Sequence, residues 1–138
     1  MRLGIVASRF NETIAAELLE RAQGTARELG VEPTVISVPG ALEIPLALQW
    51  MAQAGHFDAL AAVGVVIRGE TYHFEIVASE SARGLMDVAL EFGLPIANGI
   101  LTTEDEPQAL ARLDKGAEAV RVAVEMGKLG ARFKGEGA

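Results

Sequence analysis

Hydrophobic positions along this chain form two alternating kinds of segment. Short, continuous apolar runs rich in β-branched residues, such as residues 59–67, are typical of strands buried on both faces. Longer segments between them repeat apolar residues every three or four positions, as at Ala15, Leu18 and Ala22, which predicts amphipathic helices. The pattern therefore predicts strands and helices in alternation, without hairpins.

The predicted elements follow one another in regular order. Strands are expected at residues 2–7, 34–38, 59–67 and 95–101, and helices at about 15–29, 43–54 and 72–92 and from 105 onward, with a weak point at Gly116. Gly30, Gly55 and Gly93 follow the first three helices, where glycine commonly ends a helix. This order predicts an α/β fold with right-handed crossovers: a single three-layer, flavodoxin-like domain with a four-stranded parallel sheet and helices on both faces. The domain is expected at residues 1–133, with residues 134–138 as a disordered tail.

Composition bears on location and partners. Half of the residues are apolar and the mean hydropathy is +0.27, yet no apolar stretch is long enough to span a bilayer and no signal-peptide core develops near residue 1. We therefore expect a cytoplasmic protein with no membrane partner. The apolar excess is expected in strands covered on both faces and in interfaces between subunits.

Charge and residue types exclude several classes of partner. The net charge of −7 argues against a nucleic-acid partner, because broad phosphate binding needs a basic face. The chain has no cysteine, which excludes disulfides and thiol chemistry, and its two distant histidines argue against a structural metal site. A structural metal site is therefore not expected, whereas a small anionic substrate could bind in a local basic pocket.

The loops after the four predicted strands carry the chemically useful side chains. Ligands of parallel sheets bind beyond the carboxyl ends of the strands, where these loops converge. The loops contain Arg9-Phe10-Asn11, Gly40-Ala41-Leu42-Glu43, Arg68 to His73, and Thr102-Thr103-Glu104. Their convergence predicts one site at one edge of the sheet, although the last of the four is interpreted mainly as a capping turn.

His73 stands at a predicted helix start, after the turn Gly69-Glu70-Thr71. There the helix dipole disfavours imidazolium, so the side chain could act as a neutral base, or it could merely cap or pack. Free backbone N–H groups of the turn and the Thr71 hydroxyl could hold an anion, or Thr71 could simply cap the helix. Glu70 would oppose an anion unless its side chain points away or pairs with an arginine.

Three other side chains also have two interpretations. Phe10 could stack on a flat heterocycle or staple onto the following helix. Glu43 could accept hydrogen bonds from substrate hydroxyls, or be favoured by the helix dipole alone. Arg112 could clamp a phosphate or be a solvated helix residue, and His56 is interpreted as a surface residue.

Four motifs in this order make the chain resemble the lumazine synthases. They are S-R-F-N at 8–11, V-P-G-A-L-E-I-P at 38–45, G-V-V-I-R-G-E-T-Y-H-F-E at 64–75 and N-G-I-L-T-T-E at 98–104. The resemblance covers nearly the whole chain. It implies a transferase that condenses 5-amino-6-(D-ribitylamino)uracil with 3,4-dihydroxy-2-butanone 4-phosphate. The products would be 6,7-dimethyl-8-ribityllumazine, water and phosphate, in the penultimate step of riboflavin biosynthesis, with no cofactor or metal.

The resemblance also implies a role for each candidate residue. His73 corresponds to the family's proton donor. Phe10, with Asn11 beside it, would stack on the pyrimidine, and the backbone groups of Val65, Val66 and Ile67 would bind the pyrimidine edge. The ribityl chain would contact Ala41, Leu42 and Glu43. Glu70 and Thr71 would bind the phosphate, reinforced by Arg112 of an adjacent subunit, and Asn98 would line the pyrimidine pocket across the interface.

The chain departs from the family pattern at three points, two of which concern assembly. Asn98 stands where many members have Phe. Many members have an additional N-terminal strand, whereas this sequence starts almost directly at the first core strand. The connection at residues 112–116 is also shorter than the corresponding connection in members that form icosahedral shells. We therefore expect a homo-oligomer that is a pentamer or a decamer of two pentamers.

Two alternatives share parts of this pattern. A flavodoxin would need a Ser/Thr/Gly-rich phosphate loop after the first strand, and a receiver domain an acidic pair there, and Arg9-Phe10-Asn11 is neither. A paralogue that binds riboflavin or a lumazine with weak catalysis stays open as the second interpretation, because substrate and product would occupy one pocket.

Overall fold

Four parallel strands form the central layer of the structure, a computed structural model that describes residues 1–135. β1 (Leu3–Ser8), β2 (Thr34–Val38), β3 (Ala59–Ile67) and β4 (Ile96–Thr103) lie in the order β2-β1-β3-β4. Each pair of neighbouring strands is parallel. The predicted α/β class and four-stranded parallel sheet are therefore confirmed.

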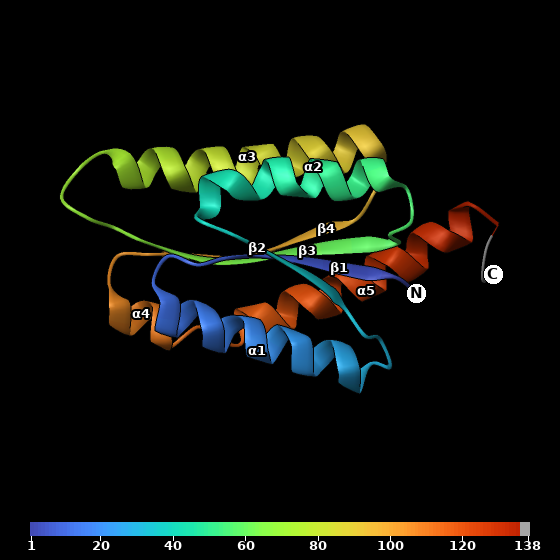
Figure 1. The fold of residues 1–138 in the computed structure, drawn as a ribbon, viewed down its shortest axis with the longest axis horizontal. Helices are drawn as coiled ribbons and strands as arrows, with labels where there is room; N and C mark the ends of the chain where they lie inside the picture. Colours follow the sequence, from blue (N-terminus) through green and yellow to red (C-terminus); the bar gives the residue numbers. More distant parts are fainter. Residues whose placement is uncertain (136–138) are drawn as a thin grey trace.

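Helices cover both faces of the sheet, as Figure 1 shows. One face carries α1 (Glu12–Glu28), α4 (Glu106–Leu110) and α5 (Lys115–Phe133); the other carries the short 3₁₀ helix η1 (Ala41–Glu43), α2 (Ile44–Ala54) and α3 (His73–Phe92). The glycines after α1, α2 and α3 have φ values of 78°, 77° and 59°, as expected of left-handed residues that end helices. The predicted three-layer arrangement is confirmed.

The central strand β3 explains why the sequence contains continuous apolar runs. Successive side chains of a strand point to opposite faces of the sheet. Val63 and Val65 belong to the core beneath α1 and α5, whereas Ala62 and Val66 belong to the core beneath α2 and α3. Because both faces are covered, every position of the strand is apolar.

The prediction of a weak point at Gly116 is wrong. α4 ends at Leu110 and α5 begins at Lys115, so the helical segment after residue 105 is interrupted at residues 111–114. Gly116 lies buried inside α5, where an added Cβ would stand 2.5 Å from the carbonyl oxygen of Leu18 in α1. The glycine allows α5 to pack closely against α1, and this packing outweighs the low helix propensity of glycine.

The two ends of the molecule differ in what they expose. The loops that follow β1, β3 and β4 gather at one end, whereas the N-terminus and the end of α5 lie at the other (Figure 1). Lys134 and Gly135 form a turn after α5; the rest of the predicted disordered tail, residues 136–138, lies outside the described residues. Within residues 1–135, no helix is long and apolar enough to cross a membrane.

Substituting Gly116 with Ala is expected to destabilise the protein by about 1–3 kcal/mol, the usual cost of overpacking a tight contact. The atom it would meet belongs to the backbone and cannot rotate away. Gly24→Ala in α1 is the control, because nothing lies within 4 Å of its added Cβ, and it should stabilise by about 0.5–1 kcal/mol. Urea unfolding followed by circular dichroism at equal protein concentration compares the two, and equal shifts would contradict the close packing.

Candidate active site

β3 extends beyond β1 at the carboxyl edge of the sheet, which leaves part of its backbone without a strand partner. The pairing of β1 with β3 runs to Ala7 and Val63, whereas the pairing of β3 with β4 continues to Ile67 and Thr103. Between β1 and β3 the strand order reverses direction, and ligands of doubly wound sheets bind at such switch points. The end of β3 therefore has a free backbone edge on the β1 side, and we call this stretch of edge, from Gly64 to Ile67, the notch.

Phe10 lies on one side of this notch, against the backbone of the next loop. Its backbone N–H donates to the carbonyl of Pro39, 3.2 Å away, and its ring packs so closely on Gly40 that an added Cβ there would stand 2.7 Å from the ring. The side chain is 65% exposed. The alternative of a hydrophobic staple onto α1 is therefore not what the structure shows, and the ring offers an open aromatic surface.

Glu43 is held beside the same ring by the backbone of Gly40. Its backbone N–H donates to the Gly40 carbonyl at 3.1 Å, and its Oε1 accepts a hydrogen bond of 2.9 Å from the Gly40 N–H. This bond occupies one carboxylate oxygen and leaves the other able to accept from a ligand. Ala41 is buried, whereas Leu42 is exposed next to it.

Asn11 connects the Phe10 loop to the end of β3. Its backbone has φ 60°, a left-handed conformation that asparagine adopts more readily than most residues. Its side-chain amide points at the carbonyl of Val65, at a distance of 3.5 Å. The Val65 and Val66 side chains are buried in the two cores, so only the backbone of these two residues can meet a ligand.

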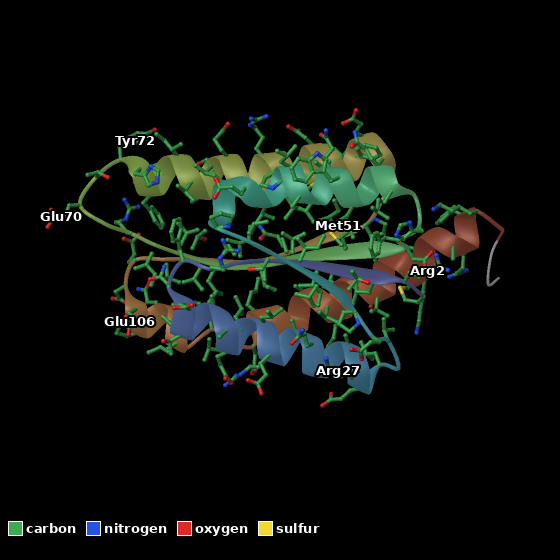
Figure 2. The ribbon with its side chains drawn as sticks, in the orientation of Figure 1. Arg2, Arg27, Met51, Glu70, Tyr72 and Glu106 are labelled. Atoms are coloured by element: carbon green, nitrogen blue, oxygen red, sulfur yellow. The ribbon has the colours of Figure 1, made fainter. Side chains whose placement is uncertain are left out.

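The loop from Arg68 to His73 continues from β3 to α3 and is exposed. The Thr71 hydroxyl accepts a hydrogen bond from the His73 backbone N–H at 3.3 Å, just before α3, whose N-cap residue is Tyr72. Figure 2 shows Glu70 at the outer tip of the loop with its carboxylate directed away from the protein. This orientation removes the objection that Glu70 would oppose an anion bound at the turn.

Arg68 joins three elements at the base of this loop. Its backbone N–H donates to Thr103 at 2.9 Å, and its guanidinium pairs with Glu75 in the first turn of α3 and with Glu104 after β4, the latter at 2.5 Å. The guanidinium carbon lies 4.4 Å from the ring centre of Phe74. Hydrogen bonds with Glu75 first, and then with Glu104, raise the pKa of Arg68, so the side chain stays charged.

Asn98 and Arg112 lie on the opposite side, at the open edge of β4. Asn98 is exposed, and its side-chain oxygen accepts from the Ile100 N–H at 2.9 Å. Arg112 donates from Nη1 to the Gln108 carbonyl at 2.9 Å, at the end of α4. The structure thus does not bring these two residues to the notch of their own chain.

A hollow of about 400 Å³ lies along this open edge of β4. It is lined by four consecutive strand residues, Ile100 to Thr103, and by the α4–α5 connection, including Arg112, Asp114 and Lys115. Thr103 and Glu104 take part in the cap of α4, in which Asp105 accepts from the Gln108 N–H at 2.9 Å. The predicted capping turn is therefore confirmed.

A larger groove, about 480 Å³, lies at the other end of the sheet, away from the candidate residues. It runs between the end of α3, the start of β4 and the second half of α5, and its lining is mostly apolar. The sequence did not predict this groove, because its walls come from three segments whose apolar residues resemble ordinary core positions. Within residues 1–135, no cluster of three potential metal-binding side chains occurs.

The sequence analysis also missed two contributors to the notch. Gly40 was noted only as part of a motif, and its close contact with the Phe10 ring depends on the path of two loops. Arg68 was noted only as a loop residue, and its partners lie 7 and 36 positions away. Neither pair of residues lies within one helix or strand, so no periodic signal indicated these contacts.

Comparisons with known proteins identify relatives over almost the whole chain. Residues 1–131 match the family model described as 6,7-dimethyl-8-ribityllumazine synthase. The 6,7-dimethyl-8-ribityllumazine synthase of Cupriavidus pinatubonensis is 55% identical over 133 residues, which cover 94% of this chain and 80% of that protein. The enzyme of the same name from an Azoarcus species is also 55% identical over 133 residues, covering 94% of this chain and 85% of its own length.

Proposed function

The chain belongs to the 6,7-dimethyl-8-ribityllumazine synthase family, and from this premise we propose that the notch between β1 and β3 is its active site. The protein is a transferase of riboflavin biosynthesis that condenses 5-amino-6-(D-ribitylamino)uracil with 3,4-dihydroxy-2-butanone 4-phosphate. The observation that carries the location is the exposed Phe10 ring beside the free backbone edge of β3.

The pyrimidine binds in the notch, stacked on Phe10. A flat heterocycle presents one face to the ring and its polar edge to the backbone of Val65 to Ile67. Asn11, whose amide lies 3.5 Å from the Val65 carbonyl, borders this edge. Because a carbonyl oxygen has two lone pairs, the Val65 carbonyl can also accept a hydrogen bond from the pyrimidine.

The ribityl chain extends from the pyrimidine over η1. The Glu43 carboxylate is fixed by the Gly40 N–H and keeps one oxygen free for the ribityl hydroxyls. Ala41 and Leu42 lie beside it on the same short helix and contact the chain through their backbone and apolar surface.

The phosphate of the second substrate binds at the turn before α3. Free N–H groups of a helix start and the Thr71 hydroxyl are donors suited to an anion. A dianion at this exposed turn also needs a cation, and Arg112 supplies it from an adjacent subunit, because its side chain lies at the open edge of β4. Asn98, on the same strand edge, faces the pyrimidine of the neighbouring site.

His73 transfers protons between the two substrates. The amine of the pyrimidine condenses with the ketone to form an imine, and water leaves. Elimination of phosphate then leaves an enol that becomes a carbonyl, and the second nitrogen attacks this carbonyl and closes the ring with loss of a second water. Each step moves a proton to or from a heteroatom or the adjacent carbon, and one exposed imidazole next to the phosphate turn can accept and return it. Holding both substrates in register supplies a further part of the rate.

The protein assembles as a pentamer or as a decamer of two pentamers. Large apolar side chains are exposed on several elements, including Leu90 at 77% and Phe133 at 87%, and the groove between α3, β4 and α5 is open and mostly apolar. Exposed apolar surface of this extent is typical of subunit interfaces. The short connection between α4 and α5 favours these assemblies over an icosahedral shell.

His73→Ala should lower kcat by roughly ten- to a thousandfold with little change in either KM, since general acid–base catalysis has about that size. Formation of lumazine from the two substrates, followed by absorbance, measures it. His56→Ala is the matched control, because this second histidine lies on a surface turn where its ring contacts Phe57. A wild-type protein that binds lumazine but does not form it would instead support the paralogue with weak catalysis.

Arg112→Ala should raise the KM for the butanone phosphate by about tenfold or more, since a charge-assisted contact to phosphate is lost. Binding of inorganic phosphate, titrated directly, should weaken in parallel. A rise confined to the KM of the pyrimidine would show that the assignment is wrong.

Mixing the two impaired variants, with activity measured at a butanone phosphate concentration below the KM of Arg112→Ala, tests the sharing of sites between subunits. If His73 and Arg112 of one site come from different chains, refolded mixtures of His73→Ala and Arg112→Ala regain activity at about a quarter of the sites on random assembly. Refolding each variant alone is the control. No recovery in the mixture would mean that both residues serve the site of their own chain.

Light scattering at micromolar concentration should give the mass of five or ten chains of 14.6 kDa. The exposed apolar surface and the shared site both require contact between copies. A monomer would contradict the shared site, and a megadalton particle would show that the short α4–α5 connection does not prevent shell formation.

A further inference from the structure

We propose that Arg68 is a positioning residue of the reaction, which holds the turn at residues 69–72 and the start of α3 in the place where His73 reaches the substrates. This inference rests on the proposed function of His73 and Thr71. Arg68 itself touches neither substrate; it acts through the loop whose two ends it joins.

The contacts of Arg68 span both ends of the loop. Its own backbone continues the β3–β4 ladder through the Thr103 carbonyl, so the start of the loop is fixed to the sheet. Its side chain reaches forward to Glu75, in the first turn of α3, and sideways to Glu104, beyond the end of β4. One guanidinium thus ties the end of the sheet to the start of the helix that carries His73.

The ring of Phe74 fixes the orientation of the Arg68 guanidinium. Phe74 follows His73 directly and packs against the core beneath α2 and α3. The Arg68 guanidinium lies over this ring at 4.4 Å, and a planar cation on an aromatic face has a defined orientation. The backbone at His73 is therefore held between a core contact and an ion-pair network.

The loop itself has little else to hold it. Within residues 1–135, the hydrogen bonds of residues 69–72 are local: Thr71 accepts from the His73 N–H, and the Tyr72 carbonyl accepts from Glu75 and Ile76 at the helix start. All six residues from Arg68 to His73 are exposed. Without the Arg68 side chain, only the covalent chain and the packing of α3 would fix the position of the turn relative to β3.

Charge explains why Arg68 positions the loop rather than binding the phosphate. Its one positive charge faces two carboxylates, Glu75 and Glu104, and both arms of the guanidinium are occupied. The cluster therefore carries a net negative charge, which does not attract a dianion. Partly exposed ion pairs of this kind contribute little to global stability, so we expect the effect of Arg68 on the loop rather than on the fold.

The test uses steady-state kinetics of Arg68→Ala and Arg68→Lys in the full-length oligomer. Misplacing a catalytic group by about 1 Å can cost roughly a hundredfold, so kcat should fall about ten- to a hundredfold in the Ala variant with less than a twofold change in KM for the pyrimidine. Lys keeps the charge but lacks the planar fork, and should recover only part of the loss.

A second readout follows the loop without relying on activity. Tyr72 is the only tyrosine of the chain and lies within the loop, so 3-fluorotyrosine places a single ¹⁹F label there. Both Arg68 variants should shift the ¹⁹F resonance and narrow it, as expected of a more mobile side chain, while the melting temperature stays within a few degrees.

Arg83→Ala is the matched control for loss of an exposed arginine. Arg83 also pairs with two carboxylates, Glu80 and Asp87, each at 2.8 Å, but it lies farther along α3. This variant should leave kcat and the ¹⁹F signal unchanged.

Three results would overturn the proposal. Unchanged kcat and ¹⁹F signal in both Arg68 variants would show that the contacts of Arg68 do not position the loop. A rise in the KM of the butanone phosphate with unchanged kcat would make Arg68 a phosphate ligand. An equal loss in Arg83→Ala would make the effect non-specific.

Failure of the proposed function and failure of this inference give different results. If the wild-type protein forms no lumazine, the proposed function fails. If His73→Ala lowers the rate of lumazine formation and Arg68→Ala does not, only this inference fails.

Discussion

The site depends on the difference in length between two adjacent strands that are buried on both faces. β3 has nine residues and β1 has six, and their register is set because side chains of β3 enter two separate cores. A slip of one residue would exchange the two faces, so the register cannot drift. The excess length of β3 therefore lies at the carboxyl edge, next to the point where the strand order reverses, and leaves its backbone open beside Phe10 and Asn11.

The elements and the convergence of the candidate loops could be predicted from the sequence. Strand runs, helix periodicity and helix-ending glycines gave most boundaries to within a few residues. The convergence of the loops follows from parallel topology alone. Gly116 was misjudged because local propensity marks glycine as a weak point, whereas its close contact with Leu18 is a tertiary feature.

Details that depend on side-chain direction could not be predicted. Two interpretations of Phe10 were open because the direction of its ring depends on the left-handed backbone of Asn11 and on the space left by Gly40, which has no side chain. The partners of Arg68 come from two other elements, and no repeat links their positions. Sequence reasoning could place Arg112 and Asn98 across an interface only through family resemblance; in the structure they lie on the open edge of β4.

The charges at the carboxyl edge couple the proposed chemistry to assembly. Of the two arginines in the loops after β1 and β3, Arg9 donates to Ser37 on β2, away from β3, and Arg68 is held by two carboxylates. In a single chain, the phosphate dianion of the substrate would therefore meet Glu43 and the hydrogen-bond donors of the turn at residues 69–72. Neither of these two loops provides a free arginine to balance its charge. Arg112 and Lys115 line the hollow at the β4 edge. On the proposed assignment, a lone subunit would bind the uncharged heterocycle but would lack the cation for the butanone phosphate, so the complete site would form only between subunits.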